Sequence, residues 1–350
     1  MSGTRVWVAR VCVILTLLAG GVWAADARET ASLPVSKPVK QDSGLAELQR
    51  RFARLERAVP GRLGVAVLHV ESGRTVAWRG REPFSMASVM KLPLAVVALD
   101  AVERGALALD EGLTVRAADL RPVGPLAERQ GVVGSAVPVR DLIEAMLIES
   151  DNTAADLLLA RLGGPVAVTA RLRELGIAGV RIDRPELGLM ADSVGFAIPS
   201  DQDRTLAELE RRMAAVGPKR RAEAARRFAQ DPRDRASPLA MAQLLARLQR
   251  GTVLSDSSRR LLLGAMERCR TGPGRLRGQL PPRTVVAHKT GTNGSSVNDV
   301  GLITLPAGKG HLAVAVFVHS AQATTERREE AIARAARLAY ETFSAQRSGG

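Results

Sequence analysis

The sequence predicts an α+β fold in which an antiparallel sheet carries an inserted all-α domain. Strand patterns occur near both ends of the chain, as a hairpin at 63–70 and 74–79 and as three further runs between 284 and 320. The stretch between them, 106–265, is mostly of helical pattern. Strands at both ends around a helical middle favour one five-stranded sheet, flanked by terminal helices.

Two segments precede the expected domain. Residues 1–24 have the pattern of a secretory signal peptide, with Arg5 and Arg10 before an apolar stretch too short to span a bilayer. Residues 25–44 form a polar, proline-containing leader that we expect to be flexible. We therefore expect a periplasmic or secreted protein, with no stable membrane insertion after the signal is removed, and one catalytic domain over 45–344.

Hydrophobic periodicity places the elements of that domain. Apolar residues recur at helical spacing up to Val59, where Pro60-Gly61 ends the first helix, and again over the last helix, 325–344. The three later strands are expected at 284–292, 298–305 and 311–320. We assign 45–85 and 270–344 to the sheet part, 86–269 to the α part, and about 192–230 to an insertion.

A serine lies three residues ahead of a lysine at the start of an apolar run, 86–105, which we expect to be a helix. Positions i and i+3 share one helix face, so Ser88 Oγ and Lys91 Nζ would lie within hydrogen-bond reach at the helix N-terminus. A nucleophilic serine needs an adjacent base, and a lysine held away from water can supply it. Pro93 is expected to bend this helix. Alone, this motif arises easily by chance.

Two further motifs follow in order. Ser150-Asp151-Asn152 comes after a helical pattern, and Lys289-Thr290-Gly291-Thr292 comes after a strand pattern. The order S-x-x-K, S-D-N, K-T-G is that of class A β-lactamases and penicillin-binding proteins. From 45 to 343 the chain therefore resembles a class A serine β-lactamase of the penicilloyl-serine transferase superfamily. His288 and the strand at 298–301 make it most similar to the extended-spectrum, His-Lys-Thr-Gly branch.

The resemblance implies the fold of β-lactamases and transpeptidases and a role for each motif residue. Ser88 would be the nucleophile, Lys91 would position or accept its proton, and Ser150 would relay that proton to the β-lactam nitrogen. The backbone N–H groups of Ser88 and Thr292 would form the oxyanion hole. The residues implied to bind substrate are Asn152, Lys289 as a fixed positive charge, Thr290, Gly291 and Thr292. From the residues alone, Ser150 or Asn152 could instead be helix caps, and Lys289 a surface charge.

Glu186 separates two related functions. Acylation alone would make a penicillin target, whereas hydrolysis also needs a base that activates water against the acyl-enzyme. Asp183-Arg184 and Glu186 match the Ω-loop pattern of the family, which implies that Glu186 is this base. Whether the lysine or the glutamate is the acylation base is disputed for the family. Met190 departs from the pattern, because the family usually has an asparagine there that shares the hydrolytic water.

These observations favour hydrolysis of β-lactam antibiotics through a serine acyl-enzyme, with two alternatives. The first is a penicillin-binding D-Ala-D-Ala peptidase-like protein or slow acyl trap with poor deacylation, favoured by Met190 and the charged insertion at 192–230. The second is a non-catalytic cell-wall-binding relative, which would need no activated nucleophile. No aromatic residue lies near Arg121-Pro122, where relatives often place a ring beside the cleft.

Composition argues against several other classes. The net charge is +14, but basic residues alternate with acids and aromatic residues are few, which disfavours nucleic-acid binding. Removal of the signal leaves Cys269 as the single cysteine, so we expect neither an internal disulfide nor a cysteine metal site. The four histidines lack metal-ligand spacing. We expect a monomer without cofactor or metal, whose partner is a small-molecule β-lactam.

Overall fold

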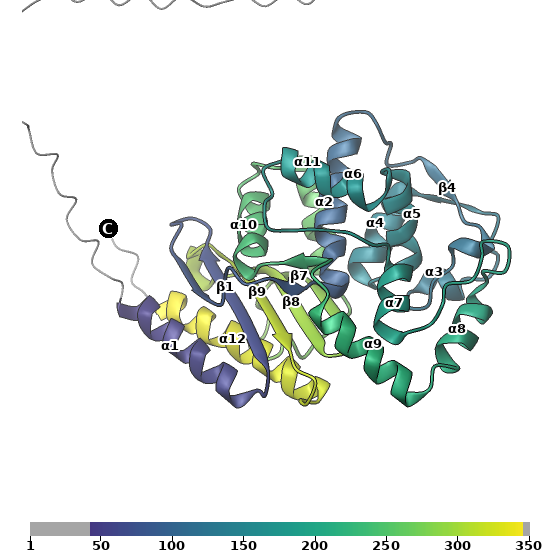
Figure 1. The fold of residues 1–350 in the computed structure, drawn as a ribbon. Helices are drawn as coiled ribbons and strands as arrows, with labels where there is room; N and C mark the ends of the chain where they lie inside the picture. Colours follow the sequence, from purple (N-terminus) through teal and green to yellow (C-terminus); the bar gives the residue numbers. More distant parts are fainter. Residues whose placement is uncertain (1–42, 346–350) are drawn as a thin grey trace, which may run out of the picture. The chain divides into compact units, whose positions relative to one another are not determined.

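The computed structural model describes residues 43–345, so the expected signal peptide and almost all of the expected leader lie outside the described residues. Five strands form one sheet in the order β2-β1-β9-β8-β7. Each neighbouring pair in this sheet is antiparallel. Helices lie on both faces of the sheet, which confirms the predicted α+β class (Figure 1).

The five strands lie where the sequence predicts them, within two residues at each end. Their bounds are Arg62–His69 for β1, Thr75–Trp78 for β2, Val286–Asn293 for β7, Ser296–Thr304 for β8 and His311–His319 for β9. Two short ribbons were not predicted. They pair β3 (Phe84–Ser85) with β6 (Arg235–Ala236), and β4 (Gly112–Thr114) with β5 (Ala136–Pro138).

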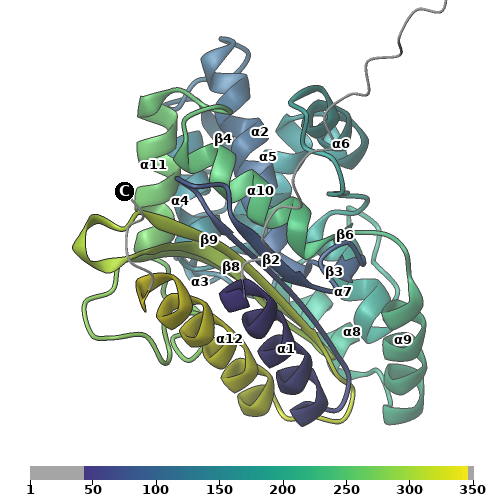
Figure 2. The same cartoon turned by 90° about the vertical axis from the view of Figure 1, so that its left-hand side faces the viewer.

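The first and last helices cover one face of the sheet. α1 (Ser43–Ala58) and α12 (Thr325–Ala345) contact each other and the strands beneath them, as Figure 2 shows. Their apolar faces meet in one core cluster, in which Phe52 and Ile332 are fully buried. Both agree with the terminal helices that the 3.6-residue periodicity predicts.

The opposite face of the sheet is covered by α10 (Pro238–Gln249), which contacts β1, β8 and β9. Successive side chains of a strand point to opposite faces, so a central strand can feed two cores. In β9 the residues of the core under the terminal helices are Leu312, Val314, Val316 and Val318, and those of the opposite core are Ala313, Ala315 and Phe317. The apolar character of both faces explains why β9 shows a nearly continuous hydrophobic run.

The α part is built around α2 (Lys91–Glu103), which contacts four other helices and is buried on all sides from Lys91 to Ala101. The helices around it are α4 (Val139–Ile148), α5 (Asn152–Arg161), α6 (Gly164–Glu174) and α11 (Asp256–Glu267). A helix that is apolar all round belongs inside a large core. Among residues 43–345 the structure contains no helix long and apolar enough to cross a membrane.

The expectation of one helix over 86–105 is partly wrong. The run begins as a 3₁₀ turn, η1 (Ala87–Met90), and becomes α-helical only at Lys91. Pro93 consequently lies in the first turn of α2, where backbone N–H groups have no partner within the α-helix itself. The loss of its N–H, which the expected bend presumed, therefore costs little at this position.

The expected insertion, 192–230, contains two helices, in keeping with the helical pattern of 106–265. They are α8 (Leu206–Ala214) and α9 (Pro218–Gln230), and α9 contacts α7 (Glu186–Val194). A small apolar cluster joins the insertion to α7. Its buried members are Leu187, Ala191, Phe196 and Leu209. The insertion is thus packed against the helix that begins with Glu186.

Candidate active site

Four separate stretches of chain supply the residues that the motifs single out. Ser88 lies in η1, and Lys91 begins α2. Ser150 lies in the turn before α5, Glu186 begins α7, and Lys289 lies on β7, which contacts η1. Hydrogen bonds join all five of these side chains into one network. The structure therefore brings the three motifs and Glu186 together, as the sequence predicts.

Ser88 lies within reach of both candidate bases. Its Oγ donates to Glu186 Oε1 at 3.3 Å and accepts from Lys91 Nζ at 3.2 Å. Lys91 Nζ and Glu186 Oε1 form an ion pair at 3.0 Å. Lys91 is fully buried and Glu186 is 5% exposed. In this arrangement Glu186 can take the serine proton directly, and Lys91 can do so after it has given a proton to Glu186.

Lys91 also holds the second motif. Its Nζ donates to the Ser150 carbonyl at 2.7 Å and to Asn152 Oδ1 at 2.5 Å. Asn152 Nδ2 in turn donates to the Pro122 carbonyl at 2.9 Å. The amide group of Asn152 is thus fixed at both ends, and its oxygen keeps one lone pair for a further donor.

Ser150 stands between two lysines. Its Oγ lies 3.4 Å from Lys91 Nζ and 3.0 Å from Lys289 Nζ. The backbone of Ser150 is left-handed, with φ of 60°, a conformation that a non-glycine residue keeps only when its surroundings enforce it. The alternative of a helix cap is wrong for both Ser150 and Asn152. Asp151 caps α5 instead, by accepting from Ala154 N at 2.7 Å.

Lys289 is fully buried, so the alternative of a surface charge is wrong. Besides Ser150 Oγ, its Nζ donates to the Thr290 carbonyl at 2.8 Å. Burial and the nearby charge of Lys91 lower the pKa of Lys289 to about 7. The positive charge that the resemblance implies is therefore one that titrates near neutral pH in the substrate-free protein.

Gly291 lets β7 approach the backbone of the nucleophile. A Cβ at this position would lie 2.5 Å from Met86 O and 3.2 Å from Ser88 N, so any larger residue would push β7 away. The next residue, Thr292, accepts at Oγ1 from Arg275 Nη2 at 2.7 Å. Arg275 Nη1 also donates to the Gly291 carbonyl at 3.2 Å. Sequence reasoning missed Arg275, because a single arginine in an arginine-rich chain carries no pattern.

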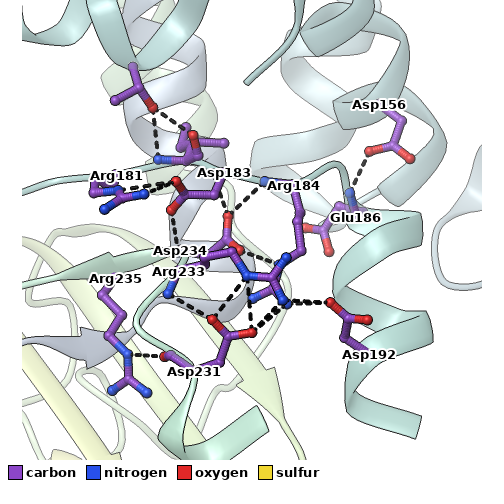
Figure 3. A network of polar contacts seen from close by, with 12 residues as sticks. Asp156, Arg181, Asp183, Arg184, Glu186, Asp192, Asp231, Arg233, Asp234 and Arg235 are labelled. Atoms are coloured by element: carbon purple, nitrogen blue, oxygen red, sulfur yellow. Dashed lines mark hydrogen bonds and ion pairs between the residues drawn. The ribbon is translucent and has the colours of Figure 1, made fainter. Parts of the chain in front are cut away.

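Figure 3 shows how Asp183 and Arg184 anchor the segment before Glu186. Asp183 and Asp234 accept hydrogen bonds from each other's backbone N–H groups, at 2.8 and 2.7 Å. The Arg184 guanidinium donates to Asp234 at 2.6 Å, to Asp192 at 2.5 Å and to Asp231 at 3.0 Å. Asp192 and Asp231 stand at the two ends of the insertion. One guanidinium thus holds both ends of the insertion beside the start of α7.

A second carboxylate, that of Asp156, holds the start of α7 from the other side. It accepts from Glu186 N at 2.6 Å and from Leu187 N at 3.3 Å. Arg121 Nε donates to it at 2.8 Å, and both members of this ion pair are at most 7% exposed. Sequence reasoning missed the pair. The spacing of Asp156 four residues after Asn152, on one face of α5, was the available signal.

Met190 lies against the same amide that Lys91 holds. Its Sδ is 3.6 Å from Asn152 Nδ2. A thioether sulfur is a weak hydrogen-bond acceptor and donates nothing. Met190 thus fills the space beside Asn152 without offering a strong polar group to a water molecule, in agreement with the sequence-based expectation.

Comparisons with known proteins agree with this geometry. The sequence model of the β-lactamase enzyme family matches residues 47–343. β-Lactamase L2 of Stenotrophomonas maltophilia is 35% identical over 289 residues, which cover 82% of this chain and 83% of the relative. The carbapenem-hydrolysing β-lactamase KPC of Klebsiella oxytoca is 32% identical and covers 83% of this chain and 87% of its own length.

Solved structures of the same class are similar in fold. An ancestral class A β-lactamase, GNCA, superimposes with a TM-score of 0.68 at 36% identity and covers 84% of this chain and 99% of its own. A β-lactamase from Xanthomonas campestris pv. campestris gives a TM-score of 0.71 at 30% identity, covering 85% of this chain and 98% of its own. Sequence and fold therefore point to the same class of enzyme.

Proposed function

This chain belongs to the class A serine β-lactamases, and from that premise we propose that it hydrolyses β-lactams through an acyl-enzyme on Ser88 and a water activated by Glu186. The observation that carries the proposal is the position of Ser88 Oγ, within 3.3 Å of both the Lys91 ammonium and the Glu186 carboxylate. A serine becomes a nucleophile when an adjacent base can take its proton.

In the acylation step, Ser88 Oγ attacks the β-lactam carbonyl carbon while its proton passes to Glu186, or to Lys91 after Lys91 has given a proton to Glu186. The backbone N–H groups of Ser88 and Thr292 stabilise the oxyanion, a contribution of about 3 kcal/mol for each donor in acyl transfer. When the ring C–N bond breaks, Ser150 Oγ delivers a proton to the leaving nitrogen. Its place between Lys91 and Lys289 supports this role, because Ser150 can replace that proton from an ammonium group.

In the deacylation step, Glu186 accepts a proton from a water molecule, and the resulting hydroxide attacks the acyl carbon. The ester bond to Ser88 then breaks, and the serine regains its proton. Asp156 and Arg184 support this role by holding the start of α7 in place, through the backbone of Glu186 and the chain just before it. A general base contributes roughly 10²- to 10⁴-fold to such a step.

We assign substrate binding to the residues around β7 and Asn152. Lys289, Thr290 and Thr292 would bind the carboxylate of the β-lactam, with Arg275 orienting the Thr292 hydroxyl. Gly291 lets β7 lie close against the backbone of Ser88. The free lone pair of Asn152 Oδ1 would accept from the side-chain amide of the substrate.

The test is to mix the purified protein with a chromogenic cephalosporin and follow ring opening and intact mass together. We expect many turnovers per molecule with little standing adduct. Ser88→Ala should show neither turnover nor adduct, while Ser193→Ala, at a partly buried serine of α7, should keep both. Turnover retained by Ser88→Ala would overturn the proposal.

We also infer export of the protein, which rests on the signal pattern of residues 1–24. Expressed in a Gram-negative host, it should be recovered from the periplasm or medium, with an N-terminus directly after Ala24. Activity confined to the cytoplasm with an intact N-terminus would contradict this inference. We expect size-exclusion chromatography with light scattering to give the mass of a monomer.

A further inference from the structure

A free thiol lies buried behind the strand that carries Lys289. Cys269 is 4% exposed, and its Sγ lies 3.3 Å from Thr271 Oγ1. His288, the residue before Lys289 on β7, is fully buried beside it. The catalytic steps above use neither Cys269 nor His288.

His288 is oriented by a carboxylate. Its Nδ1 lies 2.9 and 2.8 Å from the two oxygens of Asp299, which is also fully buried. Asp299 is fixed in turn, because its Oδ2 accepts from Leu276 N at 3.1 Å. The other ring nitrogen, Nε2, is buried and lacks a hydrogen-bond partner among the described residues. A buried imidazole nitrogen without a partner is costly and needs an explanation.

Cys269 and His288 act on each other electrostatically. Burial raises the pKa of the Cys269 thiol, but the adjacent His288, with the charge of Lys289, outweighs it and lowers that pKa to about 7. Burial lowers the pKa of His288, but Asp299 and Cys269 outweigh it and raise that pKa to about 9. Near neutral pH a large share of the thiol is therefore thiolate, the form that reacts with oxidants.

The thiol is two hydrogen bonds from the proposed carboxylate subsite. Thr271 Oγ1, which contacts Cys269 Sγ, also forms a hydrogen bond with Thr290 Oγ1. Lys289 Nζ donates to the carbonyl of the same Thr290. A change at the sulfur would thus reach a hydroxyl that we place against the substrate.

We propose that Cys269 is an oxidative modification site, at which a hydroperoxide converts the thiolate to a sulfenic acid and so weakens the carboxylate subsite at Thr290. The thiolate sulfur attacks one peroxide oxygen, the S–O bond forms and the O–O bond breaks. The sulfur is oxidised by two electrons, and hydroxide leaves from hydrogen peroxide. That hydroxide takes a proton from the His288 imidazolium and becomes water.

A sulfenic acid at Cys269 would contact two neighbouring groups, His288 and Thr271. The new oxygen gives the unpartnered His288 Nε2 a hydrogen-bond partner. The new oxygen also takes up space beside the sulfur, and Thr271 Oγ1, which contacts the sulfur, is the group that it would displace. Displacement of Thr271 breaks its hydrogen bond to Thr290, which leaves the Thr290 hydroxyl free to rotate away from the substrate carboxylate.

The first test is chemical and does not depend on the proposed function. The purified full chain is treated with hydrogen peroxide and dimedone, and peptide mapping locates the adduct. We expect one adduct on Cys269 and none there in Cys269→Ala. Intact mass should show one added oxygen that dithiothreitol removes, unlike methionine sulfoxide. If Cys269 stays unmodified while added glutathione is fully oxidised, the proposal is wrong.

The second test measures the effect on the subsite and rests on the proposed function. Oxidised protein should show a KM about tenfold higher for a β-lactam, as expected for one lost hydrogen bond, and dithiothreitol should restore it. Cys269→Ala, or Cys269→Ser if the alanine variant does not fold, should be insensitive to peroxide. Oxidation of Cys269 without any change in KM would overturn the link to Thr290. A protein that never turns over would instead refute the proposed function and leave the adduct result standing.

Discussion

Asp156 positions Glu186 through its backbone alone. Its carboxylate binds two N–H groups at the start of α7 and one buried guanidinium, that of Arg121. Burial raises the pKa of Asp156, whereas the charge and hydrogen bond of Arg121 lower it. The pair therefore couples the stability of the interior to the placement of the proposed water-activating base.

Asp156→Ala should lower both the stability of the protein and the rate of deacylation. It removes the acceptor of Glu186 N and leaves Arg121 buried without its partner, which costs about 3–5 kcal/mol in the free energy of unfolding. We expect deacylation to slow more than acylation, so that an acyl adduct builds up during turnover. Urea denaturation and intact mass measure the two effects. Asp156→Asn keeps an acceptor but not the charge, so it should regain part of the deacylation rate and little of the stability.

Met190 is the residue at which this chain departs from the family pattern. Met190→Asn places an amide beside Asn152 that can share the hydrolytic water. We expect faster deacylation, with kcat up to about tenfold higher for slowly released substrates, because one added hydrogen bond is worth about 1 kcal/mol. Rapid-quench measurement of acyl-enzyme decay tests this. The matched variant Met190→Leu should leave the decay rate unchanged.

The pKa of Lys289 limits the pH range in which carboxylate-bearing substrates bind well. A lysine whose pKa is lowered to about 7 is charged below that pH and neutral above it. The kcat/KM for carboxylate-bearing β-lactams should therefore fall as the pH rises through about 7, since this parameter reports the free enzyme.

Two variants identify the group that causes this fall in kcat/KM, the alkaline limb of the pH profile. Lys289→Arg should abolish the limb, because arginine stays protonated, although substrate binding is weaker overall. Cys269, which titrates in the same range, must be excluded by Cys269→Ala, in which the limb should persist. A limb that survives in Lys289→Arg would show that another group titrates.

At the scale of elements, the insertion is a support for α7. Leu209 on α8 is fully buried in the cluster that contains Leu187 and Ala191 of α7. Leu209→Ala should destabilise this cluster by about 2–5 kcal/mol through the cavity it leaves. We expect faster hydrogen exchange in α7 and slower deacylation, with acylation unchanged. Glu210→Ala, at an exposed position of the same helix, is the control. If both variants change hydrogen exchange in α7 equally, α8 does not support α7 through Leu209.

The elements that sequence reasoning located are those with a long apolar period. Both terminal helices and four of the five strands in the sheet bury several residues each, whereas β2 buries only Val76 and is predicted as the second strand of a hairpin. The ribbons β3–β6 and β4–β5 are two or three residues long, too short for any period. The 3₁₀ start of the nucleophile helix depends on the left-handed Ala87, with φ of 47°, and no local propensity favours that conformation in an alanine.

At the scale of the whole molecule, the site joins residues that are far apart in the sequence. Ser88 lies in the first third of the chain, Glu186 near its middle and Lys289 in its last third. The motifs predicted their meeting, because their order and spacing match one known architecture. The supporting charges, Arg121, Asp156 and Arg275, were not predicted. The contacts by which they act on the site join residues at least 16 positions apart in sequence, and only the fold selects them.

The fate of the Ser88 adduct in Glu186→Gln tests directly whether Glu186 activates the deacylating water. After mixing with a penicillin, intact mass should show one molecule of ring-opened substrate on Ser88 that persists for minutes or longer, while steady-state turnover falls about 10²- to 10⁴-fold. Glu210→Gln, at an exposed glutamate of α8, should turn over like the unmodified protein. Turnover in Glu186→Gln at the normal rate, with no standing adduct, would show that Glu186 is not the base that activates the deacylating water.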